Sequence, residues 1–235
     1  MKNVLIGGPI SHHHAYCWNS FVTGIHGIQG DYTLCFVDNS KDDTFFQKAS
    51  HDVPIIRCPY HPNVKKRLAD SRNIVRKKVL DEGYEWLFCV DQDVVCPPDV
   101  LQRMLSHHAP IVTGVYFNPF TKKGKDGLVE TRVKPVLWVY SRKYRGMLDF
   151  VKTDIARSGR LITVNSCGTG CILIHRSVLE KITFRYENDK DGVDDVFFCI
   201  DVQQLGYRIV ADTSVQCEHL IDHRPQQWGE GDLRV

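Results

Sequence analysis

The sequence predicts a single α/β domain in which helices cover both faces of a mostly parallel sheet. In the first half of the chain, short apolar runs alternate with helical segments. These runs are apolar on both faces, which is typical of parallel strands that are buried on both sides. The chain has 235 residues, enough for one such domain to bury a large core. In sheets of this kind, ligands bind beyond the carboxyl ends of the strands.

Apolar runs and the residues that interrupt them place each element of the first half. Strands are expected at residues 3–6, 32–37, 54–57, 85–90 and 111–116. A helix is expected over residues 64–80, which Gly83 ends, and another over 97–107, which two prolines open. The polar segment 121–127, TKKGKDG, is expected to form a surface loop.

The second half shows a less regular alternation of elements. Strands are expected at residues 135–140, 161–164, 171–175 and 207–210, and helices at 176–182 and 194–205. The sequence contains no internal repeat, low-complexity tract or clear linker. We therefore expect one domain, 1–235, with two functional halves, 1–116 and 117–235.

Composition narrows the classes of protein that the chain can belong to. Its 30 basic and 28 acidic residues leave a net charge of +2, so global electrostatics predict no nucleic-acid partner. No segment reaches the roughly 18 uninterrupted apolar residues of a membrane span, and the apolar run at the N-terminus is too short for a signal peptide. We expect a soluble, cytoplasmic protein without a transmembrane segment, with peripheral attachment to a membrane as the alternative.

The nine cysteines form no CxxC pair. Cys35, Cys89, Cys171 and Cys199 lie within apolar segments, which favours small buried hydrophobic side chains in a reducing compartment. The spacings do not match those of zinc ligands. Cys167 and Cys171 are a close pair in the second half, but their spacing is only a weak indication of a metal site.

Asp91 and Asp93 directly follow the apolar strand at 85–90. If this segment is extended, residues two apart point to the same side, so both carboxylates face one ligand while Gln92 faces away. Carboxylates this close repel each other unless a cation lies between them. Hard oxygen ligands suit Mg²⁺ or Mn²⁺, which bridge to phosphate oxygens. The alternative is a polar turn before the helix at Asp99, but the strand-end position favours the metal.

Other polar residues carry two interpretations each. Asp38 follows the second strand and either accepts hydrogen bonds from a base or ribose, or builds an Asx turn with Ser40. Arg72 lies on the apolar stripe of the helix at 64–80, so it needs a partner, either a strand-end carboxylate or a bound diphosphate. Asp194 and Asp195 open a helix, where they either cap it or supply a general base.

Histidines also occur near the edge of the sheet where the strands end and a ligand is expected. His219 follows the last predicted strand. It is a candidate ligand only if the fold brings this segment next to Asp93. His12, His13 and His14 lie in the loop after the first strand. Three consecutive histidines cannot all point one way, so we expect mainly loop residues, one of which could contact a ligand.

Four motifs occur in the order found in one known family. FVDNSKDDT resembles its "V-D-D/N-S-x-D-x-T" segment, and LADSRNIVRKKVLDEGYEWLFCVDQD its "A-R-N … D-x-D" stretch. CGTGCILIHRSVLEKI resembles its acceptor-side segment, and DGVDDVFFCIDVQQLGYRIVAD its "E-D" helix and following strand. The sequence thus resembles the GT-A-fold glycosyltransferases, especially glycosyltransferase family 2. The resemblance implies a Rossmann-like, mostly parallel central sheet flanked by helices, with a smaller acceptor-side β region.

The same resemblance implies an enzyme that moves a sugar from a UDP- or GDP-sugar to a hydroxyl of a glycan, lipid-linked or protein acceptor. It implies dependence on Mn²⁺ or Mg²⁺ and inversion at the sugar carbon. The Gln-x-x-Arg-Trp motif of processive synthases is absent, which favours a non-processive enzyme. The alternatives are a sugar-nucleotide pyrophosphorylase, disfavoured because GGPISHHH contains no Lys or Arg, and a non-catalytic nucleotide- or sugar-binding module.

The resemblance also implies roles for individual residues. Nucleotide-sugar binding falls to residues at the strand ends and on the helix at 64–80: Pro9, Ile10, Asp38, Arg72, Asn73, Asp91 and Gln92. Asp93 is implied as the direct metal ligand, with His219 as its partner and Asp91 as a further ligand. Asp195 is implied as the catalytic base, with Asp194 as the alternative because an Asp-Asp pair stands in place of Glu-Asp.

Overall fold

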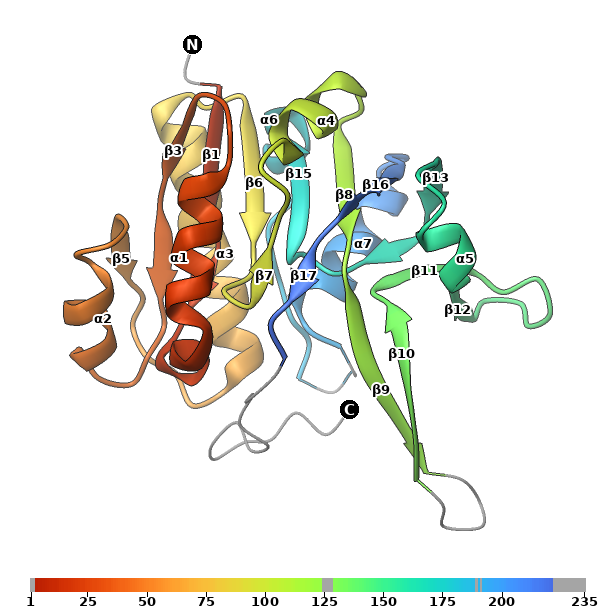
Figure 1. The fold of residues 1–235 in the computed structure, drawn as a ribbon, viewed down its shortest axis with the longest axis horizontal. Helices are drawn as coiled ribbons and strands as arrows, with labels where there is room; N and C mark the ends of the chain where they lie inside the picture. Colours follow the sequence, from red (N-terminus) through yellow and green to blue (C-terminus); the bar gives the residue numbers. More distant parts are fainter. Residues whose placement is uncertain (1–2, 124–128, 189, 191, 222–235) are drawn as a thin grey trace.

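The computed structural model describes residues 3–123, 129–188, 190 and 192–221. Within these residues, seven strands form the central sheet (Figure 1). Its order is β13 (Leu161–Val164), β16 (Ile209–Gln216), β8 (Ile111–Val115), β15 (Cys171–His175), β6 (Trp86–Val90), β1 (Val4–Gly7) and β3 (Tyr32–Leu34). Strands β3, β1, β6, β8 and β16 run one way, while β15 and β13 run the other. The predicted α/β class with a mostly parallel sheet is confirmed.

Helices cover both faces of this sheet (Figure 1). On one face lie α1 (Trp18–Gly27), α2 (Thr44–Ala49) and α4 (Val100–Ser106), and on the other α3 (Val64–Glu82), α6 (Arg176–Leu179) and α7 (Asp194–Gln204). The described buried residues accordingly form two hydrophobic clusters, one on each face. Leu5 and Ile6 are neighbours on β1 and belong to different clusters. This alternation explains why the strands are apolar on both faces.

The predicted strand at 32–37 is divided between two sheets. β3 pairs with β1, whereas β4 (Phe36–Asp38) lies between β2 (Pro9–Ile10) and β5 (Ile55–Arg57). The backbone changes its hydrogen-bond partner between Cys35 and Phe36. Cys35 N donates to Ile6 O in β1, whereas Phe36 N donates to Pro54 O, next to β5. The two-residue strand β2 was not predicted from the sequence.

Gly7 and Gly8, at the end of β1, allow the neighbouring backbone at Cys35 and Val90 to approach closely. A Cβ on Gly7 would lie 2.1 Å from Cys35 O, and one on Gly8 would lie 2.4 Å from Val90 O. Any side chain at either position would therefore push the strands apart. The close approach brings the ends of β2, β4 and β6, with the polar residues that follow them, to one edge.

The helix predicted at 64–80 is confirmed as α3, which is two residues longer. The Asn63 side chain accepts hydrogen bonds from the backbone N–H groups of Lys65 and Lys66, and Gly83 ends the helix with a φ of 75°. The helix predicted at 97–107 begins later, as α4, because both prolines stay outside it and Asp99 is its N-cap residue.

In the second half, the strands predicted at 161–164 and 171–175 are confirmed with the same bounds, and the helix at 194–205 is confirmed as α7. The strand predicted at 207–210 begins at Ile209 and is longer. The helix predicted at 176–182 ends at Leu179.

A hairpin of β9 (Phe117–Lys123) and β10 (Val129–Pro135) projects from the body of the molecule (Figure 1) and was not predicted. Part of the expected loop at 121–127 belongs to β9, and residues 124–127 lie outside the described residues. A small sheet pairs β11 (Leu137–Tyr140) with β12 (Leu148–Phe150) and β14 (Ser166–Cys167), next to the short helix α5 (Thr153–Ala156).

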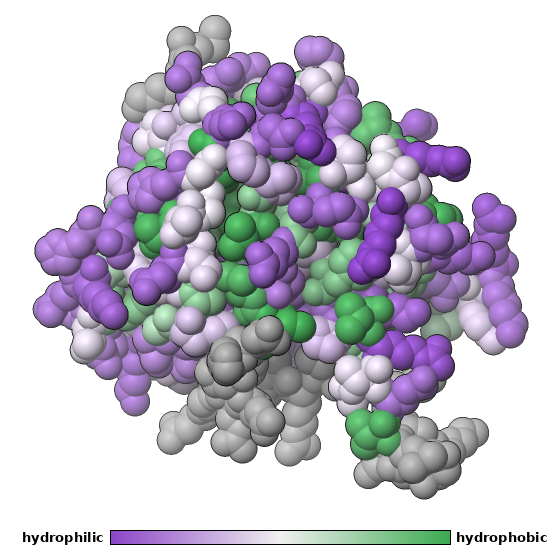
Figure 2. Space-filling view, in the orientation of Figure 1, coloured by the Kyte–Doolittle hydropathy of each residue, from purple (hydrophilic) through white to green (hydrophobic). Residues whose placement is uncertain are grey.

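Figure 2 shows one face of the molecule, where hydrophilic side chains dominate the outline and apolar ones lie mainly near the middle. Among the helices that the structure describes, none combines the length and the apolar character needed to cross a membrane.

Candidate active site

Asp93 lies between two imidazole rings at the edge of the sheet. Its Oδ2 is 3.4 Å from Nε2 of His14 and 3.4 Å from Nε2 of His219. His14 is carried by a 3-10 helix, η1 (His12–Cys17), which follows β2. His219 arrives through a short antiparallel pairing of β17 (Glu218–His219) with β7 (Val94–Val95), in which His219 lies opposite Val94. The structure thus brings together three side chains that are distant in sequence and of types that can bind a metal.

The surroundings of His219 determine which ring nitrogen faces Asp93. Its Nδ1 is 2.8 Å from Phe117 O, and a carbonyl can only accept, so Nδ1 carries the hydrogen. In the neutral ring, Nε2 then presents a lone pair to the Asp93 carboxylate. Two electron-rich atoms that face each other need a positive charge between them, supplied either by a proton on the ring nitrogen or by a metal ion. An imidazole held by a carbonyl is also the usual form of a histidine metal ligand. The side chains present therefore fit a divalent cation.

The same neighbours keep Asp93 charged. Burial alone would raise its pKa, but hydrogen bonds with His14 and His219 hold the pKa of Asp93 well below its usual range. His14 was not selected from the sequence. The three consecutive histidines were the available signal, but only the path of η1 decides which ring reaches Asp93.

The extended geometry expected for residues 91–93 is wrong. Val94 N donates to Asp91 O at 3.0 Å, so the segment is a turn. Asp91 and Asp93 consequently have different partners, and Asp91 pairs with Arg72. Gln92 binds the backbone after β2: its Oε1 accepts from Ser11 N at 2.8 Å and its Nε2 donates to His14 O at 3.1 Å. The Gln92 amide therefore fixes the loop that carries His14.

Arg72 joins two carboxylates inside the protein. Its Nε is 2.6 Å from Asp194 Oδ2, and its Nη2 is 3.0 Å from Asp91 Oδ1. The guanidinium is buried, so the prediction that it pairs with a strand-end carboxylate is confirmed. Burial lowers the pKa of Arg72, but Asp194 and Asp91 together raise it above its usual value. The charge on Arg72 is therefore permanent.

Asp194 and Asp195 are adjacent but have different environments. Asp194 is fully buried against Arg72, whereas Asp195 is half-buried and its Oδ1 accepts from Val196 N at 2.6 Å. Burial, with a further contribution from Asp194, raises the pKa of Asp195 to about 7. Asp195 is thus the carboxylate of the pair that can exchange a proton near neutral pH.

Tyr116 lies among these groups and was not singled out from the sequence, where it only ended an apolar strand. Its hydroxyl accepts from Gly170 N at 3.3 Å, and its ring centroid is 5.2 Å from that of His219. Burial, and then Asp91 and Asp195, raise the pKa of Tyr116 well above its usual value. Tyr116 is therefore near both carboxylates as well as the histidine.

Three of the predicted nucleotide-binding residues, Asp38, Pro9 and Ile10, are buried in the structure. Asp38 is fully buried, with its Oδ1 accepting from Ser40 N at 2.9 Å and its Oδ2 from Arg57 Nη1 at 2.5 Å. The alternative of an Asx turn at Asp38 is thereby confirmed. Pro9 and Ile10 form the buried strand β2 beside it. A nucleotide role for these three residues stays a prediction.

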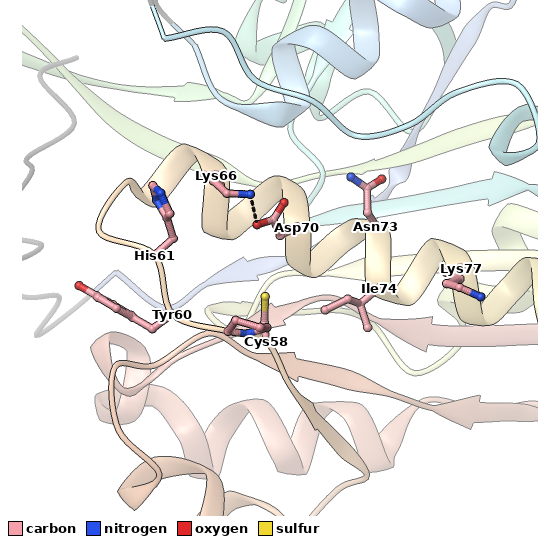
Figure 3. A pocket seen from close by; sticks show the side chains of 9 residues that line it. Cys58, Tyr60, His61, Lys66, Asp70, Asn73, Ile74 and Lys77 are labelled. Atoms are coloured by element: carbon pink, nitrogen blue, oxygen red, sulfur yellow. Dashed lines mark hydrogen bonds and ion pairs between the residues drawn. The ribbon is translucent and has the colours of Figure 1, made fainter.

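Asn73 lies on a different face of α3 from Arg72. Its Nδ2 donates to Phe184 O at 2.7 Å and its Oδ1 accepts from Phe184 N at 2.9 Å. Asn73 also lines a pocket of about 520 Å³ between α3 and the loop after β5 (Figure 3). The lining residues are Cys58, Pro59, Tyr60, His61, Lys66, Asp70, Asn73, Ile74 and Lys77.

The chain belongs to glycosyl transferase family 2, because the model of that family matches residues 17–183. The fold is similar to that of GalNAc-T7 in its crystal structure with UDP, GalNAc and Mn²⁺, with a TM-score of 0.64 and 9% identity over 97% of this chain and 45% of that one. The chain therefore spans less than half of GalNAc-T7. A197 from STIV has a TM-score of 0.49 and 17% identity over 94% of this chain and 86% of that one. No curated protein matches the sequence.

Family membership and fold together define a glycosyltransferase of the GT-A class.

Proposed function

We propose that this glycosyltransferase moves a sugar from a nucleotide diphosphate sugar to an acceptor hydroxyl, with inversion, one transfer at a time and with a divalent cation. The observation that carries the proposal is the placement of Asp93 between His14 and His219. The titratable Asp195 carboxylate adds to it, because it is close enough to Asp91 and Tyr116 for their pKa values to be linked. The family and the fold support this class of reaction over nucleotidyl transfer or simple binding.

The donor side of the site consists of cation ligands and one permanent positive charge. Asp93, His14 and His219 would hold the cation, which supplies the positive charge that stabilises the departing diphosphate. Within the described part of the chain, Arg72 Nη1 has no hydrogen-bond partner. We assign this buried donor to a phosphate or sugar oxygen of the bound donor. Asp91, fixed by Arg72, is suited to accept from a ribose hydroxyl or a water on the cation.

The first half of the chain, 1–116, would hold the donor, with Pro9, Ile10, Asp38, Asn73 and Gln92 shaping or supporting the nucleotide side. The second half, 117–235, would hold a glycan, lipid-linked or protein acceptor.

On the acceptor side, Asp195 would remove the proton of the attacking hydroxyl. The hydroxyl oxygen forms a bond to the anomeric carbon as the bond to the diphosphate oxygen breaks, and the nucleoside diphosphate leaves with the electron pair. Attack on the face opposite the leaving group inverts that carbon. Asp194 does not share this role, because its carboxylate is bound to Arg72; it positions Arg72 instead.

A panel of UDP- and GDP-sugars with Mn²⁺ tests the proposal directly. We expect one donor class to raise the melting temperature and to be hydrolysed slowly without an acceptor. A ligand at 100 times its Kd stabilises a protein by about 2.7 kcal/mol, which a thermal scan detects readily. If no member of the panel stabilises the protein or is hydrolysed, the proposed donor class is wrong.

Mn²⁺ is expected to support donor hydrolysis better than Mg²⁺, with EDTA abolishing the reaction. The reason is the donor set, because Mg²⁺ prefers oxygen ligands and His14 and His219 offer nitrogen. The measurement is the initial rate as each metal is titrated into metal-free protein. A higher rate with Mg²⁺ at saturation would contradict the proposed ligand set.

His14→Ala is expected to weaken Mn²⁺ binding by about tenfold or more, since loss even of a residue that supports a ligand costs 10–100-fold. His12→Ala is the matched control, because His12 belongs to the same 3-10 helix and is exposed. Mn²⁺ affinity is measured by electron paramagnetic resonance of the free ion. Equal affinities of the two variants would remove His14 from the site.

A further inference from the structure

Three cysteine side chains meet beside the β7–β17 pair. Cys96 directly follows β7, Cys217 directly precedes β17, and Cys171 begins β15. The Sγ atom of Cys96 is 3.7 Å from that of Cys171 and 3.7 Å from that of Cys217. All three Sγ atoms lie within 4.8 Å of one another. Cys96 is 75 residues from Cys171 and 121 from Cys217 in the sequence, so no local spacing predicts this cluster.

The distances match the coordination geometry of a thiolate-bound ion. Zinc binds cysteine sulfur at about 2.3 Å, so two sulfurs on a tetrahedral zinc are about 3.8 Å apart. The observed separations of 3.7 Å therefore admit such an ion with little movement of the side chains. A disulfide would require two sulfurs to approach to about 2.05 Å and would leave the third without a bond.

We propose that Cys96, Cys171 and Cys217 bind one soft divalent cation of the zinc type, at a site separate from the Asp93 group. Soft sulfur ligands select such an ion over Mn²⁺ or Mg²⁺. As each metal–sulfur bond forms, the thiol releases its proton to solvent. Cys96 and Cys171 are buried, and Cys217 is half-buried, so the ion enters from the side of Cys217.

The proposed cysteine site lies next to the backbone that carries Asp93 and His219. The cation would link β15 of the central sheet to one end of the β7–β17 pair, where Cys96 follows β7 and Cys217 precedes β17. That pair follows Asp93 and carries His219. The thiolate site therefore stabilises the backbone on which those two side chains are held, without supplying a ligand to them.

Cadmium titration tests the site, because Cd²⁺ bound to thiolates gives an ultraviolet charge-transfer band that nitrogen and oxygen ligands do not give. Metal-free, reduced protein should develop the band up to one Cd²⁺ per chain, and excess Mn²⁺ should not remove it. Cys96→Ser and Cys217→Ser should lose the band. Cys199→Ser should retain it, because Cys199 is equally buried but contacts Cys167 instead. Asp93→Ala should also retain it.

Alkylation of the unmodified protein gives a second measurement that does not depend on folding of the variants. With one equivalent of Cd²⁺, mass spectrometry of partly unfolded protein should show protection of Cys96, Cys171 and Cys217 beyond that of the other cysteines. A missing band at one equivalent, equal loss of the band in Cys199→Ser, or uniform protection of all cysteines would overturn the proposal. None of these outcomes depends on donor binding or transfer, so they are distinct from failure of the proposed function.

Discussion

Asp195→Asn is expected to lower the rate of sugar transfer by about 10²–10⁴-fold, the usual contribution of a general base. The amide cannot accept the proton of the acceptor hydroxyl, while the proposed donor contacts at Asp93 and Arg72 are unchanged. Donor binding, measured by thermal stabilisation, should therefore be retained. Asp154→Asn is the matched control, because Asp154 also lies in the first turn of a helix but is exposed. This pair of variants separates an enzyme from a binding module.

The pH profile provides a second test of the same carboxylate. Because a base must be deprotonated, the rate of transfer should rise as the pH increases through about 7, the pKa to which burial raises Asp195. Asp195→Asn should remove this rise from its residual activity. If the variant keeps both the rate and the pH profile of the unmodified enzyme, the base is another residue.

Arg72→Met is expected to lower the free energy of unfolding by about 3–5 kcal/mol, the cost of removing one partner of a buried ion pair. Asp194 would then be a buried carboxylate without its cation, since Arg72 is its 2.6 Å partner. The loss should be smaller at acidic pH, where protonation of Asp194 removes the uncompensated charge. Chemical denaturation at several pH values measures both effects.

Lys77→Met is the control for Arg72→Met, because Lys77 pairs with Asp81 on the exposed surface of the same helix. Exposed pairs contribute only about 0–1 kcal/mol. Adding Asp194→Leu to Arg72→Met should recover most of the lost stability, because neutral residues then replace the whole pair. A loss below about 1 kcal/mol for Arg72→Met would mean that the pair is solvated rather than buried.

The sequence was sufficient where local chemistry decides the structure. The helix α3 ends at Gly83, as its residue type predicted, whereas its amide cap at Asn63 was not singled out from the sequence. The inward position of Arg72 followed from helical periodicity, and its need for a carboxylate followed from the cost of burying an unpaired charge. The partner at Asp194 is 122 residues away, and no local rule selects it.

The site was less predictable because it depends on turns and long-range pairing. The expectation that Asp91 and Asp93 point to the same side of an extended segment was wrong. A backbone hydrogen bond from Val94 N to Asp91 O makes the segment a turn. The orientation of His14 depends on η1 and on the Gln92 amide. The approach of Tyr116 to the carboxylates depends on Gly168, where a Cβ would lie 2.0 Å from the Tyr116 hydroxyl. Such contacts exist only once the strands are assembled.

The pairing of β17 with β7 makes the order of synthesis relevant to binding. His14 and Asp93 are translated early, but His219 is among the last residues of the described fold. A nascent chain that has not yet reached this residue has two of the three side chains around the proposed cation position. In the proposed site, residues 1–116 supply only two of the three cation ligands, so this half alone is expected to bind the cation more weakly than the fold that includes His219. The proposed cation site thus needs residues from both halves of the fold, although its other two side chains lie within residues 1–116.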